Sequence, residues 1–586
     1  MFRKNASCSS ICRPALLFFL ALGQTSFAQC TFSAHGSGKL VNYSFEPILA
    51  DGKTTMRITL EFQGGHNGKA ELELPSSYAG QTDLGKAFTD LKALSEQTTI
   101  SDTASPSKKT VHFAPDTLVR ISYILVKDWN GPLNSGTRFR PILERDYFQL
   151  LADTALVKPL FDRSAIVDAQ FIWQNLPPGW SLATSFGTDN PCQQFHGMWY
   201  KVGTALFVGG DYRIYHSSVA GKPLNLAIRG KWSFTDDDWN SRVQEIIASE
   251  RTFWRDNDFP YYLVTLAPFD TEGGGTGGSA YTDAFMMHLS RNASLSYGVL
   301  SVLAHETFHI WNPYKMGGGR GEALYWFQEG FTNYYTDRML FRAGLISFPE
   351  YVQRTNEKLR EYELSPARNV SNKELTGRYE KDRSLSHVPY EHGMVVAQWL
   401  DWRIRDRSGN QVSLDTMMFK LVEDGKNDKF QLTTHGLLGT AGKYLSRGDR
   451  RLLRQYVEDG ATIPVPESAL GPCVRLQTDA IPEFELGMDA EALREKHVVA
   501  NVKPDSEAFK AGLRDGQRIT RTSVTWNDTS KLVKLTARTS DGDHAFEYYP
   551  RGPSRDIPQY HLDPSYSADT PGCTATLQPA EWKTVR

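Results

Sequence analysis

Apolar and polar residues alternate along much of the first 235 residues of the chain. The segments 56–62, 69–74 and 120–126 place an apolar residue at every second position, and glycine, proline, aspartate and asparagine separate them. A period of two is that of a β-strand with one buried face. The pattern predicts a β-sandwich-like N-terminal region over residues 29–235, which would support the rest of the protein and shape one wall of a cleft.

The period becomes helical from residue 236 to about 466. An apolar stretch over 294–311 ends at Asn312-Pro313, because proline disfavours helical geometry in the residue before it. A second helix is predicted over 322–342, with Gly344 as a left-handed stop. The remaining predicted helices span 390–405 and 414–423, the latter with Ser413 as its N-cap and Gly425 as its end. A proline-rich linker then leads to a short β-rich segment, which predicts a third, small domain over 474–586.

The first thirty residues have the pattern of a secretory signal peptide. Arg3, Lys4 and Arg13 precede an apolar run over 14–23, and small residues stand at Ser26 and Ala28 before a cleavage point. We therefore expect residues 1–28 to be removed and the product to be exported, to the periplasm or the medium. An uncleaved anchor is the alternative, but the run is too short to span a bilayer comfortably. Cleavage removes three positive charges and no negative one, so the net charge changes from −2 to −5.

Four cysteines remain after that cleavage, and they are widely spaced. An even number in an exported chain predicts two disulfides, with three pairings open and buried thiols as the alternative. None of them lies in a C-x-x-C pair, so a thiolate metal site is not expected. The four are Cys30, Cys192, Cys473 and Cys573.

The sequence His305-Glu306-Thr307-Phe308-His309 falls within the predicted helix 294–311. Positions i and i+4 of a helix lie on the same face, so His305 and His309 can hold one metal ion together. Glu306 stands one position further round, where its carboxylate can polarise a water bound to that metal. This five-residue pattern predicts a hydrolytic metal site if a third ligand lies at a suitable distance.

Glu329 is the candidate third ligand. Nineteen residues separate it from His309, which is enough for a turn and a return, so that two antiparallel helices face each other. Two histidines, one carboxylate and an open position for water form the usual catalytic zinc site. The alternative is a solvated helix carboxylate, but the aromatic neighbours Trp326, Phe327, Phe331, Tyr334 and Tyr335 make this a costly place for an unpaired charge.

The runs HETFHIWNP and EGFTNYYTDRMLFRAGL resemble the glycyl aminopeptidase family of metallopeptidases, which belongs to the gluzincin group. The stretches 390–397, 400–405 and 413–415 resemble the same family, and the resemblance covers about residues 235–465. In that family a β-rich N-terminal domain precedes a thermolysin-like catalytic domain, and a PDZ domain often follows. The resemblance implies a multidomain α+β protein with a β-rich N-terminal domain, a mainly helical catalytic domain over 236–466 and a small PDZ-like β domain.

The resemblance also implies roles for individual residues. One zinc ion (Zn2+) per chain would be held by His305, His309 and Glu329, with Glu306 as the general base and Tyr390 as the residue that stabilises the transition state. The alternative for Tyr390 is a packed aromatic residue at the start of a helix. The implied activity is hydrolysis of peptide bonds, as an aminopeptidase acting on small peptides.

A glycine-rich segment upstream of the histidines departs from the family pattern. Gluzincin aminopeptidases carry there a glutamate that anchors the free amine of the substrate, whereas the sequence here continues from Gly277-Gly278 to Ser279-Ala280 without one. We expect Gly277, Gly278, Ser279 and Ala280 to bind the substrate through their backbone, because glycine lets a peptide approach closely. Glu272, Asp270 and Asp283 are all open as replacements for the missing glutamate.

The C-terminal segment resembles a PDZ module. Leu486-Gly487-Met488 would form the carboxylate-binding turn, the run 508–517 matches a typical PDZ helix and turn, and Gln517 stands where aspartate is common. Such a groove would bind a C-terminal peptide by strand addition. The alternative is that the domain merely packs beside the catalytic cleft.

The overall charge limits the other classes of function. A formal net charge of −2, with no basic run, gives no indication of a nucleic-acid partner. No segment after the signal peptide is long and apolar enough to cross a membrane. Two rival hypotheses remain: a PDZ-bearing scaffold with a decayed peptidase fold, and a zinc hydrolase of non-peptide amides or esters.

Overall fold

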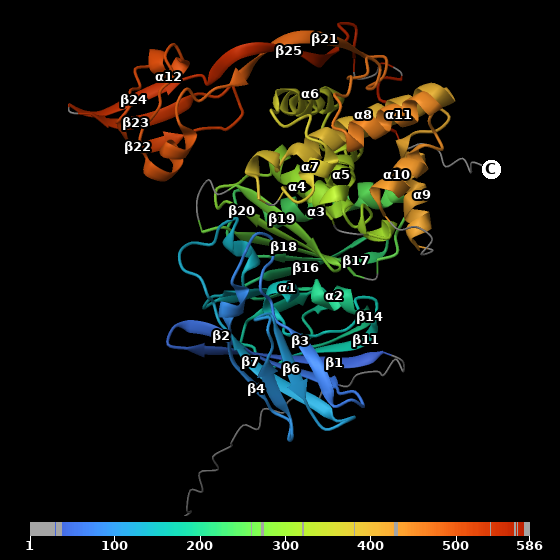
Figure 1. Ribbon diagram of the computed structural model, residues 1–586, viewed down its shortest axis with the longest axis vertical. Coiled ribbons are helices and arrows are strands. Elements are labelled where there is room, and N and C mark those ends of the chain that lie inside the picture. Colours follow the sequence, from blue (N-terminus) through green and yellow to red (C-terminus); the bar gives the residue numbers. More distant parts are fainter. Residues whose placement is uncertain are drawn as a thin grey trace, which may run out of the picture.

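The computed structural model describes residues 30, 38–259, 261–270, 275–318, 321–379, 381–426, 432–539, 541–567, 570 and 572–578. The predicted signal peptide and Glu272 lie outside these residues. Three parts follow one another along the molecule: a β-rich N-terminal part, a central part with a mixed sheet and helices, and a small C-terminal part reached by a long β-ribbon (Figure 1).

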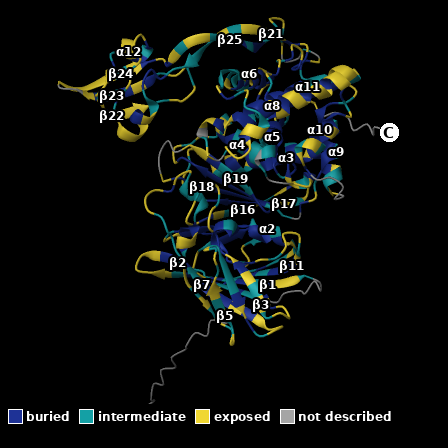
Figure 2. Ribbon diagram, in the orientation of Figure 1, coloured by how far each residue is buried: buried dark blue, intermediate teal, exposed yellow. Residues whose placement is uncertain are grey.

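The N-terminal part is built from three sheets. The largest has the order β14-β11-β1-β2-β7-β4, and all of its neighbours are antiparallel except β1 and β11. Its strands are β1 (Lys39–Ala50), β2 (Lys53–Gln63), β4 (Phe88–Ala93), β7 (Leu118–Leu125), β11 (Ile166–Trp173) and β14 (Cys192–Met198). Along β2 every second residue is buried, which confirms the strand predicted over 56–62, and the strand predicted over 120–126 is β7. Figure 2 shows the buried positions gathered inside this part.

Two smaller sheets complete the N-terminal part. One has the order β10-β3-β6-β5, and the strand predicted over 69–74 is its β3. Its strands are β3 (Lys69–Glu73), β5 (Thr99–Asp102), β6 (Lys108–His112) and β10 (Lys158–Pro159). The other, β13-β12-β15-β9-β8, consists of β8 (Ile142–Leu143), β9 (Tyr147–Leu151), β12 (Ser181–Thr184), β13 (Gly187–Thr188) and β15 (Leu206–Gly210). Two short helices, α1 (Ala152–Ala155) and α2 (Trp199–Gly203), lie between these strands in sequence.

A five-stranded mixed sheet lies in the central part, between the helices and the N-terminal part (Figure 1). Its order is β16-β17-β18-β20-β19, and β19 is an edge strand paired antiparallel to β20. The strands are β16 (Arg213–Val219), β17 (Lys222–Ile228), β18 (Leu263–Pro268), β19 (Thr276–Tyr281) and β20 (Ala284–Leu289). This sheet begins before residue 236, so the domain limit expected at 235 cuts through it. The period of a sequence pattern identifies strands but does not show which sheet they join. Here helix α3 (Asp236–Trp254) connects the parallel neighbours β17 and β18, so strands on both sides of residue 235 belong to one sheet.

The helices of the central part pack over this sheet (Figure 1). The helix predicted over 294–311 is α4 (Tyr297–Phe308), and the one predicted over 322–342 is a 3-10 turn followed by α5 (Tyr325–Arg342), after which Gly344 has the expected positive φ of 73°. The other helices are α6 (Phe348–Leu364), α7 (Asn372–Leu375), α8 (Val388–Ser408), α9 (Leu414–Lys426), α10 (Thr434–Ala441) and α11 (Arg447–Glu458). Ser413 does not cap α9 as predicted, because its hydroxyl has no hydrogen-bond partner and Asp401 Oδ1 accepts from the amide of Leu414 instead.

The C-terminal part consists of a ribbon and a small distal unit. Strands β21 (Val474–Phe484) and β25 (Arg551–Leu562) pair antiparallel, and β25 lies along α6, where Asn356 Nδ2 donates to the carbonyl of Tyr560 at 2.7 Å. The ribbon therefore packs on the central core, while the distal unit has a hydrophobic core of its own within 486–548. That unit contains α12 (Glu507–Lys510), β22 (Arg518–Ser523), β23 (Val533–Thr539) and β24 (Gly542–Tyr548).

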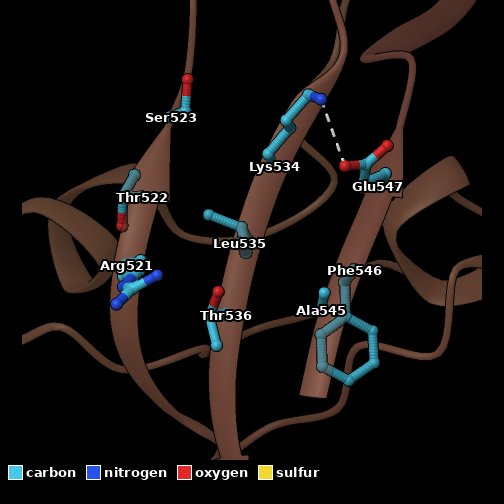
Figure 3. A pocket seen from close by; sticks show the side chains of 9 residues that line it. All are labelled: Arg521, Thr522, Ser523, Lys534, Leu535, Thr536, Ala545, Phe546 and Glu547. Atoms are coloured by element: carbon cyan, nitrogen blue, oxygen red, sulfur yellow. Dashed lines mark ion pairs between the residues drawn. The ribbon is translucent and has the colours of Figure 1, made fainter. Parts of the chain in front are cut away.

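An open hollow of about 570 Å³ lies on the distal three-stranded sheet (Figure 3). Its lining residues all come from β22, β23 and β24, so it is separate from the histidine motif. Binding of a C-terminal peptide to this unit by strand addition stays a prediction. The lining residues are Arg521, Thr522, Ser523, Lys534, Leu535, Thr536, Ala545, Phe546 and Glu547.

Two disulfides join the four cysteines in one of the three open pairings. Cys30 pairs with Cys192 in the N-terminal part, and Cys473 pairs with Cys573 at the base of the ribbon. Within the residues that the structure describes, no helix combines the length and the apolar character needed to cross a bilayer.

Candidate metal centre

Three predicted ligand atoms converge at the point where α4 and α5 face each other. His305 Nε2 lies 3.2 Å from His309 Nε2 and 3.1 Å from Glu329 Oε2, and His309 Nε2 lies 3.4 Å from the same carboxylate oxygen. Four ligands at zinc–ligand bonds of about 2.0–2.1 Å in a tetrahedron stand about 3.3 Å apart. The spacing of the three atoms therefore fits one tetrahedral face around a zinc ion, with the fourth position left for water.

The geometry of His309 is fixed by the turn that ends α4. His309 is the C-cap of this helix, and its Nδ1 donates to the carbonyl oxygen of Asn312 at 2.8 Å, which leaves Nε2 as the atom that can bind a metal. The side chain of Asn312 is fully buried, and its Nδ2 donates to the carbonyls of Phe327 and Gln328 at the start of α5. Asn312 thus ties the end of one ligand-bearing helix to the beginning of the other. The peptide bond between Asn312 and Pro313 is cis.

Two glycines bring α8 against α5 and so place Tyr390 beside the ligands. A Cβ atom added at Gly330 would lie 2.3 Å from the Cα of Gly393, and one added at Gly393 would lie 1.9 Å from the carbonyl oxygen of Trp326. The two backbones are therefore in direct contact, which only glycine permits. One turn before Gly393, the ring of Tyr390 stacks on His305 with centroids 5.7 Å apart.

The candidate ligand groups shift one another's pKa values. Burial alone would lower the pKa of His309, but the Glu329 carboxylate and its hydrogen bond raise this pKa to about 9. Burial would raise the pKa of Glu329, yet the two histidines hold it well below its usual range. A buried carboxylate is thus balanced by a proton on imidazole, and a divalent cation is the natural replacement for that proton.

Tyr390 remains a phenol at this site. Burial and the nearby Glu329 carboxylate raise the pKa of Tyr390 far above its ordinary value. Its hydroxyl is therefore a hydrogen-bond donor rather than a negative charge. Glu306 is half-buried on α4, and its negative charge acts on Tyr390 and on His309.

The four residues predicted to bind substrate, Gly277, Gly278, Ser279 and Ala280, lie on edge strand β19. A Cβ at Gly278 would lie 2.8 Å from the side chain of Val302, one turn before Glu306 on α4. A Cβ at Gly277 would lie 2.7 Å from Nη1 of Arg138, a residue of the N-terminal part. The two glycines thus make room for neighbouring side chains of the protein itself. Arg138 could not be predicted from sequence reasoning, because nothing in its surroundings relates it to a strand 140 positions away.

Two of the carboxylates considered for anchoring a substrate amine have other environments. Asp270 accepts from the amide of Leu133 at 2.7 Å and pairs with Arg291 at 3.1 Å. Asp283 lies in the turn between β19 and β20, where burial raises its pKa. In the described structure neither carboxylate contacts the histidine motif or Glu329. Glu272 lies outside the described residues.

Several other residues of the stretches that resemble the family form a buried ionic cluster that packs against α5. Asp401 on α8 accepts from Tyr334 Oη, Arg405 Nε and the amide of Leu414, each at 2.8–2.9 Å. Arg338 on α5 lies 3.7 Å from the same carboxylate. These residues join α5, α8 and the start of α9, so their part in the motif is to hold the ligand-bearing helix in place.

Comparisons with known proteins agree with this picture. Residues 298–413 match the model of the M61 glycyl aminopeptidase family. This match covers α4, α5 and the helices up to the start of α9, and it includes all three candidate ligands, Glu306 and Tyr390. No significantly similar sequence is found among curated proteins.

Solved structures extend the likeness beyond that segment. An aminopeptidase N family protein from Idiomarina loihiensis superposes with a TM-score of 0.67 at 18% identity, over 89% of this chain and 98% of that one. A mutant M1 zinc metallopeptidase from Deinococcus radiodurans, bound to a Tyr-Ser-Ala substrate, superposes with a TM-score of 0.51 at 13% identity, over 74% of this chain and 96% of that one. At these identities the likeness establishes the fold. The chain is a multidomain α+β protein whose β-rich N-terminal part and helical part are arranged as in M1 peptidases.

Proposed function

We propose that this protein is a zinc-dependent metallopeptidase that binds one zinc ion through His305, His309 and Glu329. The observation that carries the proposal is the convergence of three ligand atoms 3.1–3.4 Å apart, with Tyr390 stacked beside them. The family match of residues 298–413 to glycyl aminopeptidases supports an activity on peptides with a free amino terminus. The substrate class we propose is small peptides.

Each residue of the site has a chemical role. His305, His309 and Glu329 would hold the zinc ion, which would supply Lewis-acid chemistry by lowering the pKa of a coordinated water and polarising the peptide carbonyl. Glu306 accepts a proton from the attacking water and delivers it to the leaving amine. The Tyr390 hydroxyl donates a hydrogen bond to the carbonyl oxygen as negative charge develops on it. His309 is held in the correct tautomer by the Asn312 carbonyl, so its Nε2 lone pair stays available.

We further propose that the protein works outside the cytoplasm. Cys30–Cys192 and Cys473–Cys573 are disulfides, which persist in oxidising compartments, and this supports export after removal of residues 1–28. Within the chain, we propose that the residues that carry catalysis lie within 236–466 and that 474–586 is an accessory, PDZ-like segment for peptide binding or packing.

The test combines metal analysis with cleavage of matched peptides. We expect one zinc per chain, and hydrolysis that stops on chelation and returns with zinc. Glu306→Gln should retain zinc but lose about two to four orders of magnitude in kcat, whereas Glu458→Gln, an exposed position on α11, should behave as wild type. A chain without zinc, or one whose hydrolysis survives Glu306→Gln, would refute the proposal.

A second comparison tests the aminopeptidase assignment by itself. The same peptides are offered with a free and with an acetylated amino terminus. An aminopeptidase loses cleavage of the acetylated form. Equal cleavage of both would leave a metallopeptidase that acts elsewhere in the peptide, and cleavage only of non-peptide amides or esters would favour the rival hydrolase.

A further inference from the structure

Arg138 reaches from the N-terminal part to the edge strand β19. It lies in a short 3-10 turn, Thr137–Phe139, and its Nη2 approaches the carbonyl oxygen of Gly278 at 3.5 Å. The absence of a side chain at Gly277 gives the guanidinium its place, since a Cβ there would lie 2.7 Å from Nη1 and 2.9 Å from Cζ. The cation therefore lies against the strand along which a peptide would add.

The guanidinium has no carboxylate partner among the residues that the structure describes. Nη1 donates to the carbonyl of Ser135 at 2.9 Å, and Cζ lies 4.2 Å from the centre of the Phe139 ring. Nε is buried and has no acceptor. A desolvated cation without a directly bound carboxylate is costly, so its presence at this strand favours a ligand that supplies one.

The unpartnered edge of Arg138 is the one that binds carboxylates elsewhere in this protein. Arg213 uses Nε and Nη2 together to hold Asp236, at 2.6 and 2.8 Å. Arg538 uses the same two atoms to hold Asp543, at 2.8 and 3.2 Å. In Arg138 Nη2 has only the long contact to the Gly278 carbonyl, whereas Nε is buried, so a substrate carboxylate would bind through Nη2.

The charge of the neighbouring site favours the same ligand. Burial lowers the pKa of Arg138, while the charge of Glu306 acts in the opposite direction, so the guanidinium and the general base are close enough to interact. The two negative charges of Glu306 and Glu329 would balance a divalent ion. The positive charge of Arg138 would then be the net charge of this part of the site. The guanidinium therefore attracts a carboxylate of the substrate to this part of β19.

We propose that Arg138 is a specificity-determining residue that binds a carboxylate of the peptide substrate where the substrate lies along β19. The inference rests on the proposed peptidase function, because it assumes a peptide on that strand. Two carboxylates have the required chemistry: an acidic side chain of the substrate and its terminal carboxylate. The proposal covers both, and the test separates them.

Binding is measured by calorimetry in the zinc-loaded Glu306→Gln variant, so that no result depends on hydrolysis. Three ligands isolate the two sources: Glu-Ala-amide against Gln-Ala-amide for the side chain, and Gln-Ala against Gln-Ala-amide for the terminal carboxylate. We expect the carboxylate member of one pair to bind at least about tenfold more tightly, as a charged hydrogen bond implies. Adding Arg138→Met should abolish this preference, and Arg138→Lys should keep part of it.

Gly277→Ala provides a second variant that leaves the arginine in the chain. The new methyl group would displace the guanidinium, so the preference should fall while the thermal midpoint stays near that of wild type. Equal binding of both members of each pair, or a preference that persists in Arg138→Met, would overturn the proposal. So would an equal loss for all three ligands, which is the result of a purely structural role. Failure of the peptidase function itself would appear separately, as missing hydrolysis in the wild type.

Discussion

The contact between Gly330 and Gly393 makes a quantitative prediction about how the site is assembled. In Gly393→Ala the new Cβ would lie 1.9 Å from the Trp326 carbonyl oxygen, against an ordinary contact distance of at least 3.4 Å. The difference is 1.5 Å. The atoms that the new Cβ meets, the Trp326 carbonyl and the Gly330 Cα, belong to the backbone of α5, so neither can rotate away. Helices α5 and α8 must therefore move apart by roughly that amount.

The expected cost has two parts. Forcing an extra methyl group into a packed interface costs about 1–3 kcal/mol, and a backbone–backbone contact should place this variant at the upper end. The movement also shifts Tyr390 relative to Glu329, and a displacement of about 1 Å at a catalytic group costs on the order of a hundredfold in rate. We expect a lower midpoint in urea unfolding and a lower kcat, with zinc content near one per chain because α4 and α5 keep their ligands.

The matched control is Gly439→Ala on the exposed surface of α10, where an added Cβ meets nothing within 4 Å. This change should be neutral or stabilise by up to about 1 kcal/mol, as alanine does in a helix. The predicted clash is contradicted if the free energy of unfolding of Gly393→Ala lies within about 0.5 kcal/mol of the wild-type value and its kcat is unchanged. Equal losses of stability in both glycine variants would also contradict it, because crowding at the helix crossing would then not be the cause.

Three further changes test other parts of the site. Asn312→Ala removes the link between the end of α4 and the start of α5, and should weaken zinc binding about ten- to a hundredfold in competition with a chromophoric chelator; unchanged affinity would contradict the role given to this link. Asp401→Asn leaves the fully buried Arg338 without its counter-charge and should cost about 3–5 kcal/mol in urea unfolding, against a value near zero if the cluster is solvated. Burial and the neighbouring Glu361 raise the pKa of Glu391 to about 8, so the folded state holds a proton that the unfolded state has lost above its ordinary pKa. Stability should therefore fall between about pH 4.3 and 8, by at most about 1.4 kcal/mol per unit. In Glu391→Gln the thermal midpoint should depend less on pH over this range. Parallel curves of thermal midpoint against pH for wild type and variant would disprove the role given to Glu391.

The candidate metal ligands could be predicted from the sequence because their signal is local. His305 and His309 are one helical turn apart, and Glu329 follows among aromatic residues that make an unpaired carboxylate costly. The strands of the N-terminal part were equally accessible through their period of two. In each case the residues that determine the feature lie close together in the sequence.

Features that depend on distant contacts were not accessible in this way. Ser413 has the residue type of an N-cap, yet Asp401, twelve positions upstream, takes the helix amide because the buried cluster fixes its position. Gly425 was expected to end a helix, but α9 continues through it, and a Cβ there would lie 2.4 Å from the carbonyl of Lys315. Glycine in a helix signals either a stop or a close approach, and only the fold tells which.

The glycine-rich strand shows how the same ambiguity affects function. Read along the chain, Gly277 and Gly278 indicate a backbone open to substrate. In the fold, Gly278 lies against Val302 on α4 and Gly277 lies against the guanidinium of Arg138, so a positive charge lies beside edge strand β19. A cation in that place changes which end or side chain of a peptide is favoured without altering the hydrolytic chemistry. Under the proposed function, substrate choice is encoded in the contact between the N-terminal part and β19, whereas catalysis is encoded in the helices of the central part.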